Sequence, residues 1–264
     1  MKIGFIGCGN MATAILKGIL KSGEVAAADI IASAKSDKTR EKIEKELGIQ
    51  KADTNAQVVD FADVVFLAVK PQFLEGVLDE IKASVKEGQI FISIAPGKTL
   101  QWFAKKLGEK TKVIRTMPNT PAMVGEGMTA LCVNDLVTEE ETALAVKLCN
   151  TFGKTEVIPE RLMDVVVGVS GSSPAYVFMF LEAMADAAVA DGMPRAQAYK
   201  FAAQAVLGSA KMMLETGKHP GELKDMVCSP AGTTIQAVRV LEEKGLRSAV
   251  FEAQTTCVDK AKGM

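Results

Sequence analysis

Short apolar runs alternate with amphipathic stretches from the first residues to about residue 158. The apolar runs have the length of strands and cover 2–6, 30–33, 64–69, 90–94 and 113–115. Amphipathic stretches at 11–21, 37–47, 73–85 and 99–107 predict helices between them, and runs at 128–133 and 154–157 predict edge strands around a helix at 138–151. Buried strands separated by helices predict a doubly wound α/β domain, in which helices cover both faces of a parallel sheet.

The strand pattern stops after Pro159, and the remaining chain has the pattern of helices interrupted by glycine and proline. We therefore expect two domains, an α/β domain over 1–158 and an all-helical domain over 159–264. The stretch 175–191 is apolar over most of its circumference, so one packing partner would not cover it. We expect this helix to be buried on several sides, with another subunit as one candidate cover.

Composition limits the classes of partner. Lys and Arg total 31 and Asp and Glu total 32, so the net charge of -1 gives no general attraction to nucleic acid or an anionic membrane. The five cysteines are widely spaced, which predicts reduced thiols in a cytoplasmic protein and no metal site. We find neither a signal peptide nor an apolar run long enough to span a membrane, and a small-molecule partner is favoured.

A glycine-rich turn follows the first predicted strand and opens the first predicted helix. Gly7, Gly9 and Ala12 fit the G-x-G-x-x-G/A pattern of Rossmann-type dinucleotide-binding domains. The first glycine permits the tight turn, the second lets the backbone approach a pyrophosphate, and the small Ala12 lets helix and strand pack closely. An ordinary glycine-rich turn is the alternative interpretation.

The end of the second strand bears on the choice of cofactor. An NAD site normally has Asp or Glu there, but this chain has Ser33 and Lys35, and Asp29 comes before the strand. A hydroxyl and a lysine suit a 2′-phosphate, so NADP(H) is preferred and NAD(H) remains possible. Lys35 could equally be a solvated surface lysine.

Later strand ends should line the same crevice, because ligands of open α/β sheets lie beyond the carboxyl ends of the strands. The residues in question are Ala68, Val69, Lys70 and Pro71 after one strand, Ala95 after the next, and Asn119 after a third. Asn119 lies between two prolines, as a fixed amide that could face the nicotinamide or the substrate. A plain turn residue is the alternative.

The stretch from Cys228 to Thr234 predicts a second anion site, since it forms a turn that leads directly into a helix. Ser229, Gly232, Thr233 and Thr234 would hold the anion with hydroxyl and N–H groups, although a Thr helix cap without ligand is an alternative. The only histidine, His219, lies in a Gly/Pro break and is expected to be a loop or capping residue. Without a strong base, hydride transfer to a cyclic imine that bears a carboxylate fits these residues.

Several motifs together resemble the pyrroline-5-carboxylate reductase family over essentially the whole chain. They are Gly4 to Ala12, Leu67 to Gln72, Arg115 to Pro121, and above all His219-Pro220-Gly221 with Val227 to Ile235. The resemblance implies NAD(P)H-dependent reduction of 1-pyrroline-5-carboxylate to L-proline by a Rossmann domain followed by a helical dimerisation domain. It also implies a homodimer whose Ser229 loop faces the cofactor of the other subunit, and possible decamers.

Carried over to this sequence, the resemblance assigns the substrate carboxylate to Ser229, Gly232, Thr233 and Thr234. It assigns the cofactor or reaction pocket to Asn10, Met11, Ser33, Asn55, Ala68, Lys70, Pro71 and Asn119. We expect Thr234, Lys70 and Asn119 to lie nearest the reaction. The chain departs from the family at Ser173 and Pro96, where glycine and alanine are usual.

Two other functions fit the residues less well. A β-hydroxyacid dehydrogenase relative would need a lysine near the start of the second domain, and 169–177 contains none. A non-catalytic NADP(H) redox sensor would leave the Ser229 to Thr234 turn without a purpose.

Overall fold

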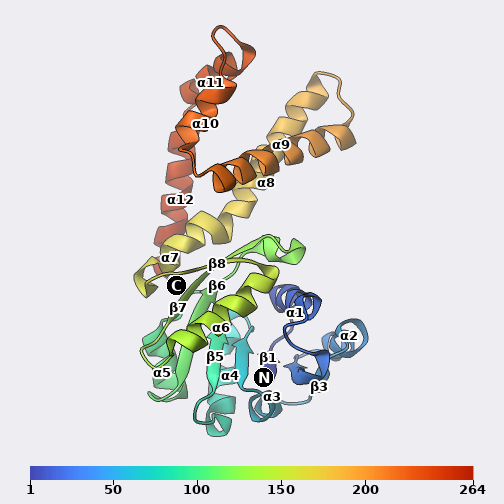
Figure 1. Ribbon diagram of the computed structural model, residues 1–264, viewed down its shortest axis with the longest axis vertical. Coiled ribbons are helices and arrows are strands. Elements are labelled where there is room, and N and C mark those ends of the chain that lie inside the picture. Colours follow the sequence, from blue (N-terminus) through green and yellow to red (C-terminus); the bar gives the residue numbers. More distant parts are fainter. Residues whose placement is uncertain (264) are drawn as a thin grey trace. The chain divides into compact units, whose positions relative to one another are not determined.

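The computed structural model describes residues 1–263 and, with the exception of Lys42, their side chains. By packing, the chain divides into a sheet unit, Met1–Gly171 with Val258 to residue 263, and a helical unit, Ser172–Cys257. The elements of both are labelled in Figure 1.

An eight-stranded sheet forms the centre of the sheet unit, in the order β3-β2-β1-β4-β5-β6-β7-β8. The strands are β1 (Ile3–Ile6), β2 (Ile30–Ser33), β3 (Gln50–Ala52), β4 (Val64–Leu67), β5 (Ile90–Ser93), β6 (Lys112–Met117), β7 (Gly127–Val133) and β8 (Gly153–Val157). Neighbours pair in parallel except β6 and β7, which are antiparallel. The predicted doubly wound sheet is confirmed, and β3 is a strand that the apolar pattern did not predict.

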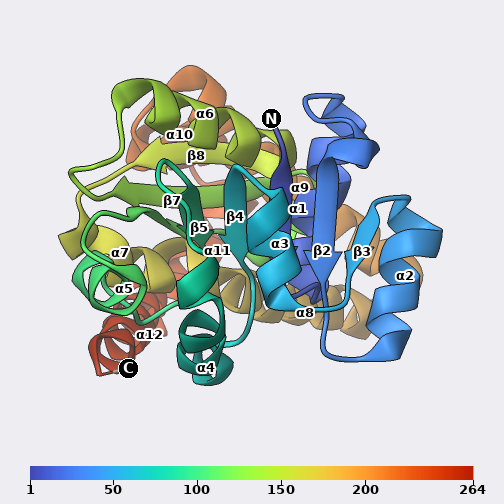
Figure 2. The ribbon, with the colours of Figure 1, turned by 90° about the horizontal axis from the view of Figure 1, so that it is seen from below.

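Helices cover both faces of the sheet (Figure 2). They are α1 (Asn10–Ser22), α2 (Asp37–Leu47), α3 (Asn55–Phe61), α4 (Pro71–Ile81), α5 (Leu100–Leu107), α6 (Glu139–Cys149) and the short α7 (Met163–Val166). Alternate strand residues enter different cores: Phe5 and Phe66 pack with α1, α2 and α6, whereas Ile6 and Leu67 pack with α3, α4 and α5. The near-continuous apolar strands therefore arise because both sheet faces are buried.

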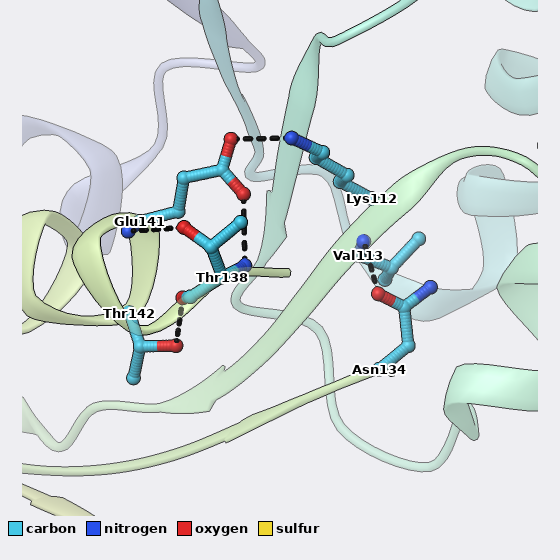
Figure 3. Close-up of polar contacts among 6 residues, drawn as sticks. All are labelled: Lys112, Val113, Asn134, Thr138, Glu141 and Thr142. Atoms are coloured by element: carbon cyan, nitrogen blue, oxygen red, sulfur yellow. Dashed lines mark hydrogen bonds and ion pairs between the residues drawn. The ribbon is translucent and has the colours of Figure 1, made fainter. Parts of the chain in front are cut away.

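Polar contacts hold α6 against β6, the third strand from the β8 edge of the sheet (Figure 3). Thr138 caps α6 through the N–H of Glu141, and the Glu141 carboxylate accepts in return from the N–H of Thr138. Lys112 Nζ of β6 lies 2.5 Å from Glu141 Oε1. Burial raises the pKa of Glu141, but the bonds from Lys112 and Thr138 outweigh it, and the net pKa is lowered. The carboxylate is thus charged and tied to both elements.

The helical unit contains α8 (Ser173–Ala190), α9 (Arg195–Thr216), α10 (Pro220–Val227) and α11 (Thr233–Glu243), and most of α12 (Leu246–Lys262). Helices α8 and α9 pack together, with an ion pair between Arg195 and Asp186. The buried residues within this unit are Ala185, Ala198 and Ala202, whereas large apolar side chains such as Phe178 and Phe201 are exposed. The unit therefore leaves most of its apolar surface uncovered.

The packing boundary differs from the boundary expected near residue 158. The last strand does end at Val157, but the sheet unit also includes 158–171 and the end of α12. Glu160 pairs with the buried Arg115 of β6 and accepts from the N–H of Leu100, 2.7 Å away. These contacts explain why the first residues after the sheet pack with it.

One expectation about membranes needs correction. The continuous helical stretch Glu160–Ala190 is long and apolar enough to cross a membrane by length and composition alone, and little of it is buried. The sequence pattern predicted only the apolar stretch 175–191, whereas the helical stretch begins at Glu160. The stretch is continuous because a π-helical turn, Val167–Ser172, connects α7 to α8.

Candidate functional site

The glycine turn between β1 and α1 has the geometry of a dinucleotide-binding turn. Gly7 has φ +94°, and a Cβ placed there would lie 2.8 Å from the carbonyl oxygen of Ala68 and 2.9 Å from Cγ1 of Val69. A Cβ at Gly9 would meet nothing within 4 Å, so that backbone is open to an approaching group. Ala12 is 1 % exposed and packs α1 against the sheet.

The start of α1 leaves its first N–H groups available. Gly9 is the N-cap residue, and no side chain caps the helix. By contrast, a Ser or Thr side chain caps α2, α3, α5 and α6, at Ser36, Thr54, Thr99 and Thr138. Uncapped N–H groups and the helix dipole favour an anion, as the pyrophosphate of a dinucleotide requires. Asn10 and Met11 are the first two residues of α1, directly after Gly9.

A cleft of about 460 Å³ adjoins the turn, beyond the carboxyl ends of β1 to β4. It brings together five predicted residues from separate elements, namely Gly7, Ser33, Lys35, Asn55 and Val69. Its other lining residues are Ala34, Arg40, Asp53, Thr54, Phe73, Gly76, Val77 and Glu80. Apolar groups of α4 beside polar groups of β2 and α3 suit a nucleoside, with a base against one wall and a ribose at the other.

A chain of hydrogen bonds crosses this cleft. Ser33 Oγ donates to Asn55 Oδ1 at 2.7 Å, and Asn55 Nδ2 donates to Glu80 Oε2 at 2.8 Å. The hydroxyl proton of Ser33 is therefore committed to Asn55, and Ser33 faces a ligand as an acceptor. Lys35 Nζ lies 5.3 Å from the centre of the Phe73 ring, in a cation–π contact that joins the loop after β2 to α4.

Three further cleft residues were not predicted from the sequence, namely Arg40, Phe73 and Glu80. All three lie on helices, one or more turns from a strand end. The expectation that ligands lie beyond the carboxyl ends of the strands identifies only residues in the loops that follow the strands. Arg40 follows Lys35 by little more than one helical turn. This spacing of two basic residues could have indicated that Arg40 lies near the same ligand. For Phe73, the sequence predicts only that it begins the helical stretch 73–85.

The other predicted residues lie at the ends of β4, β5 and β6. Ala68 is half-buried, Lys70 and Pro71 are exposed at the start of α4, and Ala95 is buried after β5. Lys70 is the N-cap residue of α4 and is exposed, and its contact with a cofactor stays a prediction. The side chain of Ala95 has little surface for a ligand, which leaves its backbone as the contact.

Asn119 is buried and already bonded within the sheet unit. Its Oδ1 accepts from the N–H of Met128 at 2.8 Å, and its Nδ2 donates to the carbonyl of Ser170 at 3.0 Å. Only one amide hydrogen remains for a ligand. The geometry makes Asn119 a residue that positions β7 and the π-helical turn, while its contact with a cofactor stays a prediction.

The Ser229 loop belongs to the helical unit and ends at the start of α11. Gly232 is the N-cap residue and no side chain caps the helix, so the N–H groups of Thr233 and Thr234 lie at an open helix start. Ala231 has φ +58°, which makes it the one non-glycine residue with positive φ among residues 1–263. Backbone strain at a helix start with two hydroxyls is typical of a ligand loop.

His219 has a structural role, as expected. Its Nδ1 accepts from the N–H of Gly221 at 3.1 Å and caps α10. The ring nitrogen that would act as a base is therefore occupied by the backbone.

Comparisons with known proteins agree with this geometry. Residues 160–264 match the family model "Pyrroline-5-carboxylate reductase dimerisation", and residues 2–97 match "NADP oxidoreductase coenzyme F420-dependent". A pyrroline-5-carboxylate reductase from Escherichia coli strain K12 is 57% identical over 261 residues, which are 99% of this chain and 97% of that protein.

Two solved structures are similar over the full length. One is a pyrroline-5-carboxylate reductase from Coxiella burnetii, with a TM-score of 0.93 and 36% identity, covering 99% of this chain and 97% of that one. The other is pyrroline carboxylate reductase from Plasmodium falciparum with NADP bound. It has a TM-score of 0.89 and 28% identity, and the match covers 100% of this chain and 97% of that one.

Proposed function

This chain belongs to the pyrroline-5-carboxylate reductase family, and from that membership we propose that it reduces 1-pyrroline-5-carboxylate to L-proline, the last step of proline biosynthesis. The enzyme is an oxidoreductase that acts on the C=N group of a cyclic imine and uses NADP(H). The single observation that carries the substrate assignment is the open start of α11 behind Ser229, an anion site without a capping side chain.

When bound, NADPH would supply a hydride to the carbon of the protonated C=N group, whose electron pair would move to nitrogen and leave the secondary amine of proline. This electrophile needs little activation, because its protonated form already accepts hydride. The protein's tasks are therefore to hold two anions in place and to align them. The glycine turn at Gly7 and Gly9 holds the pyrophosphate, and Ser229, Gly232, Thr233 and Thr234 hold the substrate carboxylate.

Three side chains are assigned to the reaction pocket. We assign Thr234 to the carboxylate through its hydroxyl and Lys70 to the negatively charged part of the cofactor at the end of β4. Asn119 is assigned mainly to positioning, with its remaining amide hydrogen directed to the cofactor. We assign His219 no role in proton transfer, because its Nδ1 already accepts from the backbone N–H of Gly221.

A homodimer is supported by the exposed apolar surface of the helical unit. In the 18 residues of α8 the one buried side chain is Ala185, while Phe178 is 63 % exposed and Met179 is 71 % exposed. Soluble proteins seldom leave so large an apolar surface in water. A second copy would cover it and would bring the Ser229 loop of one subunit to the cofactor of the other. Decamers built from such dimers are a further proposal.

The cytoplasmic location is supported by the thiols. None of the five cysteines, all of which lie within residues 1–263, forms a disulfide, and Cys8, Cys132 and Cys149 are buried. Cysteines without disulfides fit a reducing compartment.

A steady-state assay with synthetic 1-pyrroline-5-carboxylate tests the function. We expect NADPH to be oxidised in proportion to the imine added, with L-proline as the product. No oxidation of NADPH at saturating imine would remove the proposal. Light scattering of the purified protein tests the assembly, and a monomer at micromolar concentration would contradict the dimer.

A further inference from the structure

The cleft beside the glycine turn contains an arginine that lies on a helix and not at the end of a strand. Arg40 lies on α2 and lines the cleft together with Ser33 and Lys35. Its guanidinium is partly buried, with 27 % of the side chain exposed, and its Nε has no hydrogen-bond partner among the described residues. A buried donor without a partner is costly, and a bound acceptor would satisfy it.

The one ion pair of Arg40 among the described residues is weak. Its Nη2 lies 2.9 Å from Oδ1 of Asp37, one turn earlier on the same helix. Because 89 % of the Asp37 side chain is exposed, water screens this pair and the free energy that it contributes is small. The guanidinium can therefore exchange Asp37 for a stronger anion.

The other groups at the cleft are less able to hold a phosphate. Ser33 uses its hydroxyl proton on Asn55, and Lys35 lies over the Phe73 ring. Asp53 and Glu80 also line the cleft, so a dianion there needs a strong cationic partner. A guanidinium offers two parallel N–H donors to one phosphate, which an ammonium cannot do.

We propose that Arg40 is the main residue that selects NADPH over NADH, by binding the 2′-phosphate of the cofactor, and that Asp37 competes with the phosphate for this guanidinium. The inference rests on the proposed reductase function and names the residue that gives it cofactor specificity. It assigns no role in hydride transfer to Arg40.

Binding measurements without substrate test the proposal. Titration of Arg40→Gln with NADPH and with NADH, followed by cofactor fluorescence, should show a Kd for NADPH raised roughly 10- to 100-fold and a Kd for NADH unchanged. The Kd of Arg40→Lys for NADPH should lie between those of Arg40→Gln and the wild type, because lysine keeps the positive charge but lacks the two parallel N–H donors of a guanidinium. The fragments 2′,5′-ADP and 5′-AMP should reproduce the same difference.

A second variant guards against misfolding. Asp37→Asn should lower the Kd for NADPH by roughly two- to fivefold and leave that for NADH unchanged, and a damaged fold would not tighten binding. Arg239→Gln is the matched control, because Arg239 pairs with Glu243 on an exposed helix of the other unit. This control should change neither Kd.

Two results would overturn the proposal. One is an unchanged Kd for NADPH in Arg40→Gln, and the other is an equal rise for NADPH and NADH, which would show that Arg40 only supports the cleft. Failure of the wild type to reduce the imine would instead refute the proposed function, and it would leave this comparison of affinities intact.

Discussion

The side-chain amide of Asn119 donates to the carbonyl of Ser170, 51 residues later, at 3.0 Å. Ser170 lies in the π-helical turn Val167–Ser172, at the end of the sheet unit. The side chain of Asn119, two residues after β6, therefore ties this turn to the sheet unit.

This relationship predicts the effect of substitutions at Asn119. Asn119→Ala leaves the N–H of Met128 and the carbonyl of Ser170 without their partner, and should lower the free energy of unfolding by roughly 2–3 kcal/mol. Asn119→Asp keeps the acceptor but places a carboxylate against the Ser170 carbonyl, so it should be at least as destabilising at pH 7. Urea denaturation measures both. Normal stability combined with lost turnover would instead assign Asn119 to the ligand.

The two glycines of the turn should respond differently to a side chain. Gly7→Ala meets the Ala68 carbonyl and has an unfavourable φ, so the free energy of unfolding should fall by about 1–3 kcal/mol. Gly9→Val has free space around its Cβ and should unfold within about 0.5 kcal/mol of the wild type. Its Kd for NADPH should nevertheless rise at least about tenfold, which is 1.4 kcal/mol. Tight NADPH binding by Gly9→Val would argue against the pyrophosphate site.

Thr234 offers a test of the carboxylate site. Thr234→Ala should weaken binding of 1-pyrroline-5-carboxylate and L-proline by roughly 1–3 kcal/mol, because a charged group loses a hydrogen bond. The KM for the imine and the inhibition constant of proline measure this, while the Kd for NADPH should not change. Thr255→Ala is the matched control, since that exposed hydroxyl donates to the Phe251 carbonyl on α12. Identical kinetics for the two variants would remove Thr234 from the site.

Stability at alkaline pH should depend on a buried thiol. Burial raises the pKa of Cys149 to about 12, above the value of 9.0 expected for an exposed thiol. The unfolded chain therefore loses this proton at lower pH than the folded chain does. The stabilisation is complete below pH 9 and is lost between pH 9 and 12, by about 1.4 kcal/mol per pH unit.

Unfolding free energies of Cys149→Ala and the wild type, measured from pH 8 to 11, test this difference in slope. The variant should lose stability less steeply above pH 9, although it is less stable at pH 8. Parallel curves for the two proteins would show that Cys149 does not titrate on unfolding.

The fold was largely predictable because its signals are local. The apolar runs of β1, β2, β4 and β5 and the turn at Gly7 follow one another in the order that a doubly wound sheet requires. The strand β3 was missed because Gln50 and Lys51 are polar and exposed at the sheet edge. The antiparallel direction of β7 depends on its pairing with β6, which no local pattern records.

The candidate site was predictable where residues follow a strand or open a helix. Gly7, Ser33 and Asn55 line one cleft, but Arg40 is brought there by the packing of α2. The bond between Asn119 and Ser170 and the return of Ala261 to the sheet unit also depend on tertiary packing. Such contacts join residues that are distant in the sequence, so a pattern of apolar and polar positions does not contain them.

The most direct test of the account follows the hydride itself. The protein is given 1-pyrroline-5-carboxylate and NADPH deuterated at both C4 positions of the nicotinamide, and the product is examined by mass spectrometry and NMR. The account predicts L-proline with one deuterium at C5, formed in equal amount to the NADP+ produced. L-proline without deuterium, or NADPH that stays reduced in the presence of the imine, would contradict it.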